Sequence, residues 1–128
     1  MNREIKFRGR AEGDWFFGNL THVLHRQKQM MCVAQTLVEQ DTVGQFTGLY
    51  DKNGKEIYEG DVLRFYFNGN EYIVYVGFNS EVGAWCVGFK GSRNVGIRPL
   101  GVWLCEYKCI EVIGNIHDNP ELIKEQQQ

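Results

Sequence analysis

The sequence lacks a long apolar run, and this absence excludes one class of protein at the start. No segment of the 128 residues approaches the roughly 20 consecutive apolar residues that a membrane-spanning helix needs. The first ten residues carry charges where a secretory signal peptide has its apolar segment. We therefore expect a cytoplasmic protein with no membrane partner.

An excess of charge of one sign is also missing. The chain has 14 Lys and Arg against 16 Asp and Glu, which gives a formal net charge of −2 at pH 7. A chain with this balance has no global electrostatic attraction to nucleic acid or to an anionic membrane surface. Any contact with nucleic acid therefore has to depend on a local basic patch.

The cysteines lack the paired spacing of a metal site. The four cysteines are Cys32, Cys86, Cys105 and Cys109. They include no Cys-x-x-Cys pair, which strong zinc motifs contain. Cys105 and Cys109 would lie about 13 Å apart on a strand, too far to share a metal, but would be adjacent on a helix. Further ligands would have to come from Cys86, His22, His25 or His117. We expect buried thiols, no metal and no cofactor.

Motifs of known catalytic sites are missing as well. There is no Gly-x-Ser-x-Gly, and no recognisable nucleophile motif accompanies His22 or His25. Gly54-Lys55 is followed by Glu56, which would repel a bound phosphate. One acidic cluster consists of Asp51, Glu56, Glu59 and Asp61. Lys55 puts a cation where a calcium loop needs its third ligand, so we interpret these acids as residues that flank turns and expect no enzyme.

Proline is rare and glycine is abundant: the chain has two prolines and 15 glycines. This ratio favours many tight turns, and the segments between the turns alternate or are rich in branched and aromatic residues. We expect strands over 5–10, 15–23, 30–34, 62–67, 71–78, 84–89, 102–107 and 109–116. Strands at this spacing predict one mostly β domain, a small barrel or sandwich, with the first 45 or so residues as an appendage.

Two Asn-Gly pairs predict hairpins. Asn53-Gly54 and Asn68-Gly69 each lie between apolar segments, and both residue types tolerate the positive φ of a two-residue turn. At the other end, Asn119 is a good N-cap and Pro120 suits the first helical position. The sequence therefore predicts a short C-terminal helix over 119–125.

The second of these hairpins is apolar on both faces. In its return strand one face carries Tyr72, Val74, Val76 and Phe78, and the other carries Ile73 and Tyr75. A one-sided antiparallel sheet would show polar residues outside, so this hairpin is either covered within the domain or used in assembly. We expect a homo-oligomer, with candidate contacts at Phe65, Phe67, Ile73 and Tyr75.

Local basic patches support an alternative function. One strand face carries Lys6, Arg8 and Arg10, and a second group combines Lys90, Arg93 and Arg98 with Trp103 and Trp85. Arginine beside an exposed aromatic ring can stack nucleic-acid bases. These residues are candidate contacts for nucleic acid or for a protein partner, of which the protein partner is the better supported.

Three blocks of the sequence resemble a known family. They are REIKFRG (Arg3 to Gly9), VGQFTGLYDKNGKEIYEGD (Val43 to Asp61) and EVIGNIHDNPEL (Glu111 to Leu122). In this order they resemble the signature blocks of the YopX family, small proteins of phages and prophages. The first block departs from the family pattern after Arg8, where Gly9-Arg10 replaces the common Ala-Trp.

The resemblance has implications for the fold and for the kind of function. It implies an SH3-like barrel, which we place at 46–118, preceded by an N-terminal β extension over 1–45 and followed by the helix at 119–125. It carries no catalytic residues to this chain. We therefore expect a non-enzymatic accessory protein that self-associates and binds a host or phage protein, with a nucleic-acid-binding module as the alternative.

Overall fold

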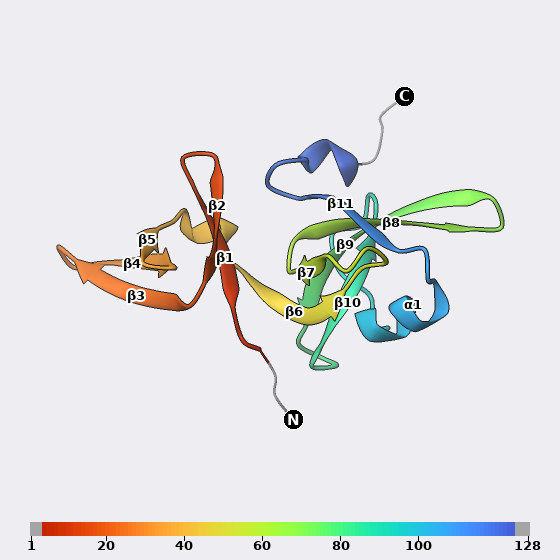
Figure 1. Cartoon of the computed structure of the whole chain (residues 1–128), viewed down its shortest axis with the longest axis horizontal. Helices are drawn as coiled ribbons and strands as arrows, with labels where there is room; N and C mark the ends of the chain where they lie inside the picture. The colour runs from red at the N-terminus through yellow and green to blue at the C-terminus, as the bar shows by residue number, and fades with distance from the viewer. Residues whose placement is uncertain (1–3, 125–128) are drawn as a thin grey trace. The chain divides into compact units, whose positions relative to one another are not determined.

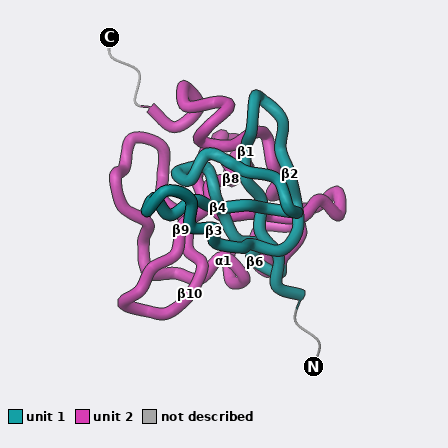
Figure 2. The backbone as a smooth tube through the Cα atoms, turned by 90° about the vertical axis from the view of Figure 1, so that its left-hand side faces the viewer, with its two compact units in different colours: residues 1–48 teal, residues 49–128 magenta. Residues whose placement is uncertain are grey.

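The computed structural model describes residues 4–124, and most of the regular structure in this range is β (Figure 1). The chain divides into two compact units, residues 1–48 and residues 49–128 (Figure 2). The helix α1 spans Leu100–Glu106 and is short. Among the described residues, therefore, no helix has the length and apolar character needed to cross a membrane.

The first unit consists of two small antiparallel arrangements. The strands are β1 (Phe7–Ala11), β2 (Asp14–Gly18), β3 (Leu20–His25), β4 (Lys28–Val33) and β5 (Thr36–Leu37), followed by a 3₁₀ turn, η1 (Gln40–Thr42), and the start of β6 (Gly44–Tyr50). β1 pairs with β2 and with the start of β6, while β3, β4 and β5 form a separate sheet. The expected strand over 15–23 is thus two strands, which separate at Gly18 and Asn19.

The core of the first unit is small. Its buried apolar side chains are Val33, Val38 and Phe46. Val38 packs directly on the backbone of β1, because a Cβ added at Gly9 would lie 2.7 Å from its Cγ2 atom. A larger residue at position 9 would therefore separate β1 from Val38.

The second unit is a curled, half-barrel sheet with the strand order β10-β9-β8-β11. Its strands are β8 (Asp61–Phe67), β9 (Asn70–Asn79), β10 (Ala84–Phe89) and β11 (Glu111–Asn115); β7 (Glu56–Tyr58) lies next to the end of β6. The expected hairpin at Asn68-Gly69 is confirmed: Phe67 pairs with Asn70, and the two turn residues have φ of 52° and 78°. Positive φ at both positions is what a type I′ turn requires.

One face of this sheet carries the main hydrophobic core. The fully buried cluster consists of Ile57, Leu63, Phe65, Val74, Val76, Val87, Leu100 and Ile110. Alternate residues of β8, β9 and β10 point to this face, and α1 contacts β10 (Figure 1). The other face is covered in part by the chain itself, since Val95 lies against Gly77 and Tyr75 lies over Gly88.

The expected extended segment over 102–107 is wrong, because residues 100–106 form the helix α1. Branched and aromatic residues such as Val102 and Trp103 favour strands locally. The tertiary pattern overrides this preference: Leu100, Trp103, Leu104 and Tyr107 recur at helical spacing, and all four pack against the core of the sheet. Pro99, in extended conformation, precedes the first helical residue.

The connection at Asn53-Gly54 differs from the expected two-residue turn. β6 ends at Tyr50 and β7 begins at Glu56, so the loop has five residues. The turn closes through hydrogen bonds from the Gly54 N–H to the Asp51 carbonyl (3.0 Å) and from the Asp51 N–H to the Lys55 carbonyl (2.9 Å). Gly54 has the positive φ expected of it, 79°.

The C-terminal segment forms a 3₁₀ turn, η2 (Pro120–Leu122), in place of the helix expected over 119–125. Residue 125 lies outside the described residues. Asn119 does not cap the turn through its side chain; instead its Oδ1 accepts a hydrogen bond from the Asn115 N–H (3.3 Å). The segment is thereby fastened to the end of β11 and does not propagate as a helix.

Candidate binding groove

Six aromatic rings meet where α1 packs against the sheet of the second unit. This aromatic cluster consists of Phe65 and Phe67 from β8, Tyr72 from β9, Phe89 from β10, and Trp103 and Tyr107 from α1 and its C-cap. Register explains the meeting of the strand residues, since Phe65 is directly opposite Tyr72 on the neighbouring strand. Helical spacing brings Trp103 and Tyr107 together, because residues four apart lie on one face of a helix.

The rings contact one another closely. Phe65 stacks on Tyr72, with centroids 5.2 Å apart, and lies 4.8 Å from Tyr107. Trp103 stacks on Tyr107 at 5.6 Å and meets Phe89 edge-on at 5.7 Å. Such contacts contribute about 0.5–1.5 kcal/mol per pair beyond the area that they bury. Contacts among the rings therefore stabilise the cluster even where its rings face solvent.

Part of the cluster remains accessible. Phe67 is 48% exposed and Phe89 is 42% exposed, whereas Phe65 is buried. The rings line a hollow of about 150 Å³. The hollow adjoins a pocket of about 300 Å³, and both are lined by Phe89 and Trp103. We refer to the hollow and the pocket together as the aromatic groove.

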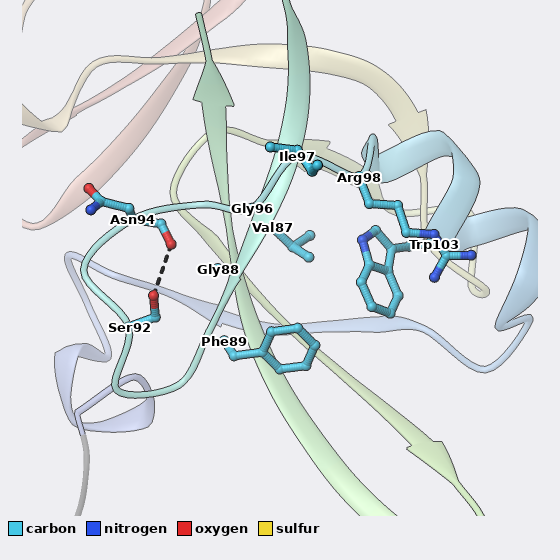
Figure 3. Close-up of a pocket in the computed structure, with 9 residues that line it drawn as sticks. All are labelled: Val87, Gly88, Phe89, Ser92, Asn94, Gly96, Ile97, Arg98 and Trp103. Atoms are coloured by element: carbon cyan, nitrogen blue, oxygen red, sulfur yellow. Dashed lines mark hydrogen bonds between the residues drawn. The ribbon is translucent and has the colours of Figure 1, made fainter. Parts of the chain in front are cut away.

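Figure 3 shows the pocket of about 300 Å³ that forms part of the aromatic groove. Val87 and Phe89 come from β10, the loop after β10 supplies Ser92 and Asn94, and Trp103 comes from α1. Ile97 borders the pocket and is 71% exposed. Among the large apolar side chains of the described residues, Leu24 alone is more exposed. The surface of the pocket is therefore mainly apolar, with a few polar groups from the loop.

Arg98 is the charged residue beside the pocket. Its guanidinium lies over the Trp103 ring, 4.6 Å from the centroid (Figure 3), and forms an ion pair with Glu106. The hydrogen bond with Glu106 raises the pKa of Arg98 above its usual value. The buried Nε1 of Trp103 has no acceptor among the described residues. The groove thus contains one cation held over a ring and one unused N–H donor.

The groove offers apolar contacts and few polar groups. The Ser92 hydroxyl donates to the Asn94 carbonyl (2.9 Å), and the described residues that line the pocket include no carboxylate, thiol or imidazole. Nucleophilic catalysis needs a nucleophile within hydrogen-bond reach of a base. An apolar surface with aromatic rings and few polar groups is instead typical of ligand and peptide recognition.

The structure brings together only part of the basic and aromatic group at 90–103. Arg98 and Trp103 are in contact, whereas Lys90 and Arg93 lie exposed in the loop after β10, outside the lining of the pocket. Trp85 lies elsewhere on the sheet and packs edge-on against Phe78, with centroids 5.2 Å apart. The candidate patch therefore narrows to Arg98 and Trp103.

The basic face expected on the first strand needs correction. Arg8 is 6% exposed, and its guanidinium lies 4.7 Å from the centroid of Trp15. Lys6 lies 5.1 Å from the ring centroid of Phe46 and forms an ion pair with Glu4 at 3.2 Å. Arg10 is half-buried, and its backbone N–H donates to Thr42 Oγ1 (2.9 Å). Burial leaves Arg8 little surface for a partner.

The expected oligomer contacts also differ in accessibility. Phe65 is 3% exposed and belongs to the core, so its expected role as a contact needs correction. Phe67 is exposed. Ile73 is half-buried, and Tyr75 donates its hydroxyl to the Ser92 carbonyl (2.9 Å), while burial raises the pKa of this tyrosine. Of the four residues, Phe67 offers the most surface.

The cysteines and histidines lie in different places. Cys105 is exposed on α1, and Cys109 follows the helix with its thiol 3.6 Å from the Tyr66 carbonyl oxygen. Cys86 is buried, and burial raises the pKa of its thiol. Over residues 4–124, no three His, Cys, Asp or Glu side chains come together as a metal site would need.

Three of the six rings in the aromatic cluster were not among the candidate contacts expected from the sequence or named beside them: Tyr72, Phe89 and Tyr107. A signal was available for Tyr107: its spacing of four from Trp103 places both on one face if the segment is helical. No comparable signal existed for Phe89, because its contact with Trp103 depends on the packing of α1 against β10.

The comparisons with known proteins agree with this fold. The model of the YopX protein family matches residues 18–124. Among solved structures, the chain is similar to protein EF1440 from Enterococcus faecalis, with a TM-score of 0.58 and 20% sequence identity over 96% of this chain and 100% of that chain. A likeness at this identity supports the fold alone. No curated protein matches the chain.

Proposed function

The chain belongs to the YopX family, and from this premise we propose that it is a non-enzymatic accessory protein of a phage or prophage that acts by binding another protein. We also propose that the second unit is an SH3-like barrel. The protein acts, in this proposal, in the cytoplasm of the host cell. The aromatic groove is the surface that binds.

One observation carries the proposal: aromatic rings that pack on one another remain partly exposed beside an apolar pocket. Phe67 and Phe89 are nearly half exposed, and Ile97 is more so. Exposed apolar surface that is concentrated in one place marks interaction sites. Tryptophan and tyrosine are also the residue types that contribute most to the affinity of protein interfaces.

The shape of the groove favours a short segment of the partner over a small metabolite. The pocket and the hollow share Phe89 and Trp103 in their linings, so the groove offers two adjacent subsites with apolar walls. An extended peptide fills such subsites with alternate side chains. The buried Nε1 of Trp103 has no acceptor among the described residues, and it is a donor for a carbonyl group of the bound segment after the side chains around it move.

Affinity capture from host cells, with and without nuclease, tests the proposal. We expect protein partners that survive nuclease and that are lost with Ile97→Asp, because a carboxylate at the border of the pocket opposes apolar contact. Val82→Asp is the matched control, since Val82 is 45% exposed and lies outside the lining of the groove. Equal recovery with both variants would exclude the groove as the binding surface.

Binding of single-stranded nucleic acid is the second candidate, and the contact between Arg98 and Trp103 favours it. A base can stack on an aromatic ring beside an arginine. Two observations oppose nucleic-acid binding: Arg98 is already paired with Glu106, and the chain has a net charge of −2. Mobility shifts with oligonucleotides decide the matter: true binding weakens steeply as salt increases, and recovery that nuclease abolishes would favour this candidate over the first.

A further inference from the structure

The edge of the three-stranded sheet in the first unit is open along β3. β3 lies at the edge of the order β3-β4-β5 and pairs only with β4 among the described strands. Five of its six residues are exposed, including Val23 at 44% and Leu24 at 74%. Natural edge strands are commonly protected by lysine, proline or a covering segment, and β3, with the sequence LTHVLH, contains neither lysine nor proline.

The register identifies which backbone groups face outward. His25 pairs with Lys28 across a two-residue turn whose residues, Arg26 and Gln27, have φ of 50° and 63°. The closing pair of such a turn is hydrogen-bonded, and hydrogen-bonded pairs then alternate along the hairpin. The bond from the Ala34 N–H to the Asn19 carbonyl (3.1 Å) fits this alternation.

Residues 21, 23 and 25 therefore direct their N–H and C=O groups toward β4. Leu20, His22 and Leu24 direct theirs away from the sheet. No hydrogen bond within residues 4–124 engages these outward groups. They form a short ladder of donors and acceptors, and the chemical group that matches such a ladder is another extended strand.

We propose that β3 pairs with β3 of a second copy of this chain, antiparallel and about a two-fold axis at His22. In this register Leu20 faces Leu24 of the second copy, and His22 faces His22 of the second copy. Any other register of the same hydrogen-bonding phase leaves at least one of the three outward residues without a partner. The two sheets would then join into one continuous sheet.

The side chains suit a second copy. Residues directly opposite each other in an antiparallel pair have Cβ atoms about 5 Å apart, so the proposed register places leucine against leucine twice and Thr21 against Val23 twice. β3 carries no Lys, Arg, Asp or Glu, and two copies therefore meet without fixed charges of like sign. A single strand pair buries less than a standard interface, so association is weak and depends on concentration.

A charge-swap experiment tests the two-fold axis at His22. The full-length protein and variants are measured by sedimentation velocity over a range of concentrations. His22→Lys places two ammonium groups opposite each other and His22→Glu two carboxylates, so each variant alone should associate at least tenfold more weakly than the unaltered protein. Mixing the two variants puts Lys opposite Glu and should restore association.

Leu37→Lys is the control, because Leu37 is an exposed leucine (50%) of β5, at the other edge of the same sheet. It should associate as the unaltered protein does. His22 is itself exposed, so its variants should fold, and circular dichroism verifies this. An unaltered protein that stays monomeric at hundreds of micromolar, or a Lys–Glu mixture that does not associate, would overturn the proposal. Neither result bears on the aromatic groove, which belongs to the second unit.

Discussion

Asp51 shows how a single side chain fixes the geometry of this fold. It is 8% exposed, and its Oδ1 accepts hydrogen bonds from the N–H groups of Asn53 (2.8 Å) and Lys55 (2.9 Å). Its Oδ2 accepts a third from the N–H of Val112 (2.9 Å). One carboxylate thus closes the β6–β7 loop and fastens it to β11.

Replacement of Asp51 should therefore destabilise the protein strongly. In Asp51→Ala three backbone N–H groups lose their acceptor, and we expect the free energy of unfolding to fall by about 3 kcal/mol. Urea unfolding followed by circular dichroism measures this. Lys55→Ala, in the same loop but at an exposed side chain, should change it by less than about 0.5 kcal/mol. Equal losses in both variants would show that the loop itself, and not the carboxylate, matters.

The sequence indicated the place of this loop but not the role of Asp51. Asn53-Gly54 marked a turn, and Gly54 has the expected positive φ. The bond from Val112, 61 residues away in the chain, has no local signature. The same limit applies to Arg8: alternation placed it on a polar face, and only the packing of Trp15 shows that it is buried.

At the scale of elements, β11 is joined to β8 by an ion pair as well as by the backbone. Glu111 is directly opposite Arg64, and the Arg64 Nη2 donates to its Oε1 at 2.5 Å. This hydrogen bond holds the pKa of Glu111 below the usual 4.5. A carboxyl whose pKa is lower in the folded state contributes stability above its unfolded pKa and loses that contribution as pH falls through the folded pKa.

We therefore expect Glu111→Gln to alter the acid side of the stability profile. The variant should be less stable than the unaltered protein at pH 7, because it lacks the ion pair. Its stability should fall less steeply below pH 4.5, because the amide at position 111 does not bind a proton as the pH falls. Urea unfolding at several pH values between 2 and 7 measures this. Glu121→Gln, at an exposed glutamate, should leave the profile unchanged. Parallel profiles for Glu111→Gln and the unaltered protein would refute the role of this pair.

Elements differed in how far the sequence predicted them. The β8–β9 hairpin was predicted well, because Asn68-Gly69 and the alternating flanks both act locally. The helix α1 was missed, because Val102 and Trp103 favour strands and the segment has only seven helical residues. The helical spacing of Leu100, Trp103, Leu104 and Tyr107 was a local signal for the helix, but the strand preference of single residues competed with it. Packing of these residues against a sheet formed largely by earlier strands decides the outcome.

At the scale of the whole molecule, the two units differ in the size of their cores. The first has Val33, Val38 and Phe46 as buried apolar residues, while the second contains the whole main core cluster. Stability varies within a structure according to buried apolar contacts. The first unit should therefore open more readily.

Native-state hydrogen exchange of dilute protein measures this difference. We expect the amides of β3 and β4 to exchange with a smaller opening free energy than those of β8 and β9. The physical reason is that fewer buried side chains have to be exposed to open the first unit. Equal opening free energies for all four strands would show that the chain unfolds as one cooperative body, contrary to the expectation.

The claim that the aromatic groove binds a partner protein is tested most directly by site-specific photo-crosslinking in host cells. Benzoylphenylalanine replaces Phe89, which lines the groove, or Tyr66, which is similarly exposed (48% against 42%) but lies on the other face of the sheet. We expect discrete, nuclease-resistant protein adducts from position 89 and none from position 66. Adducts of equal yield at both positions, or nucleic-acid adducts alone at position 89, would contradict it.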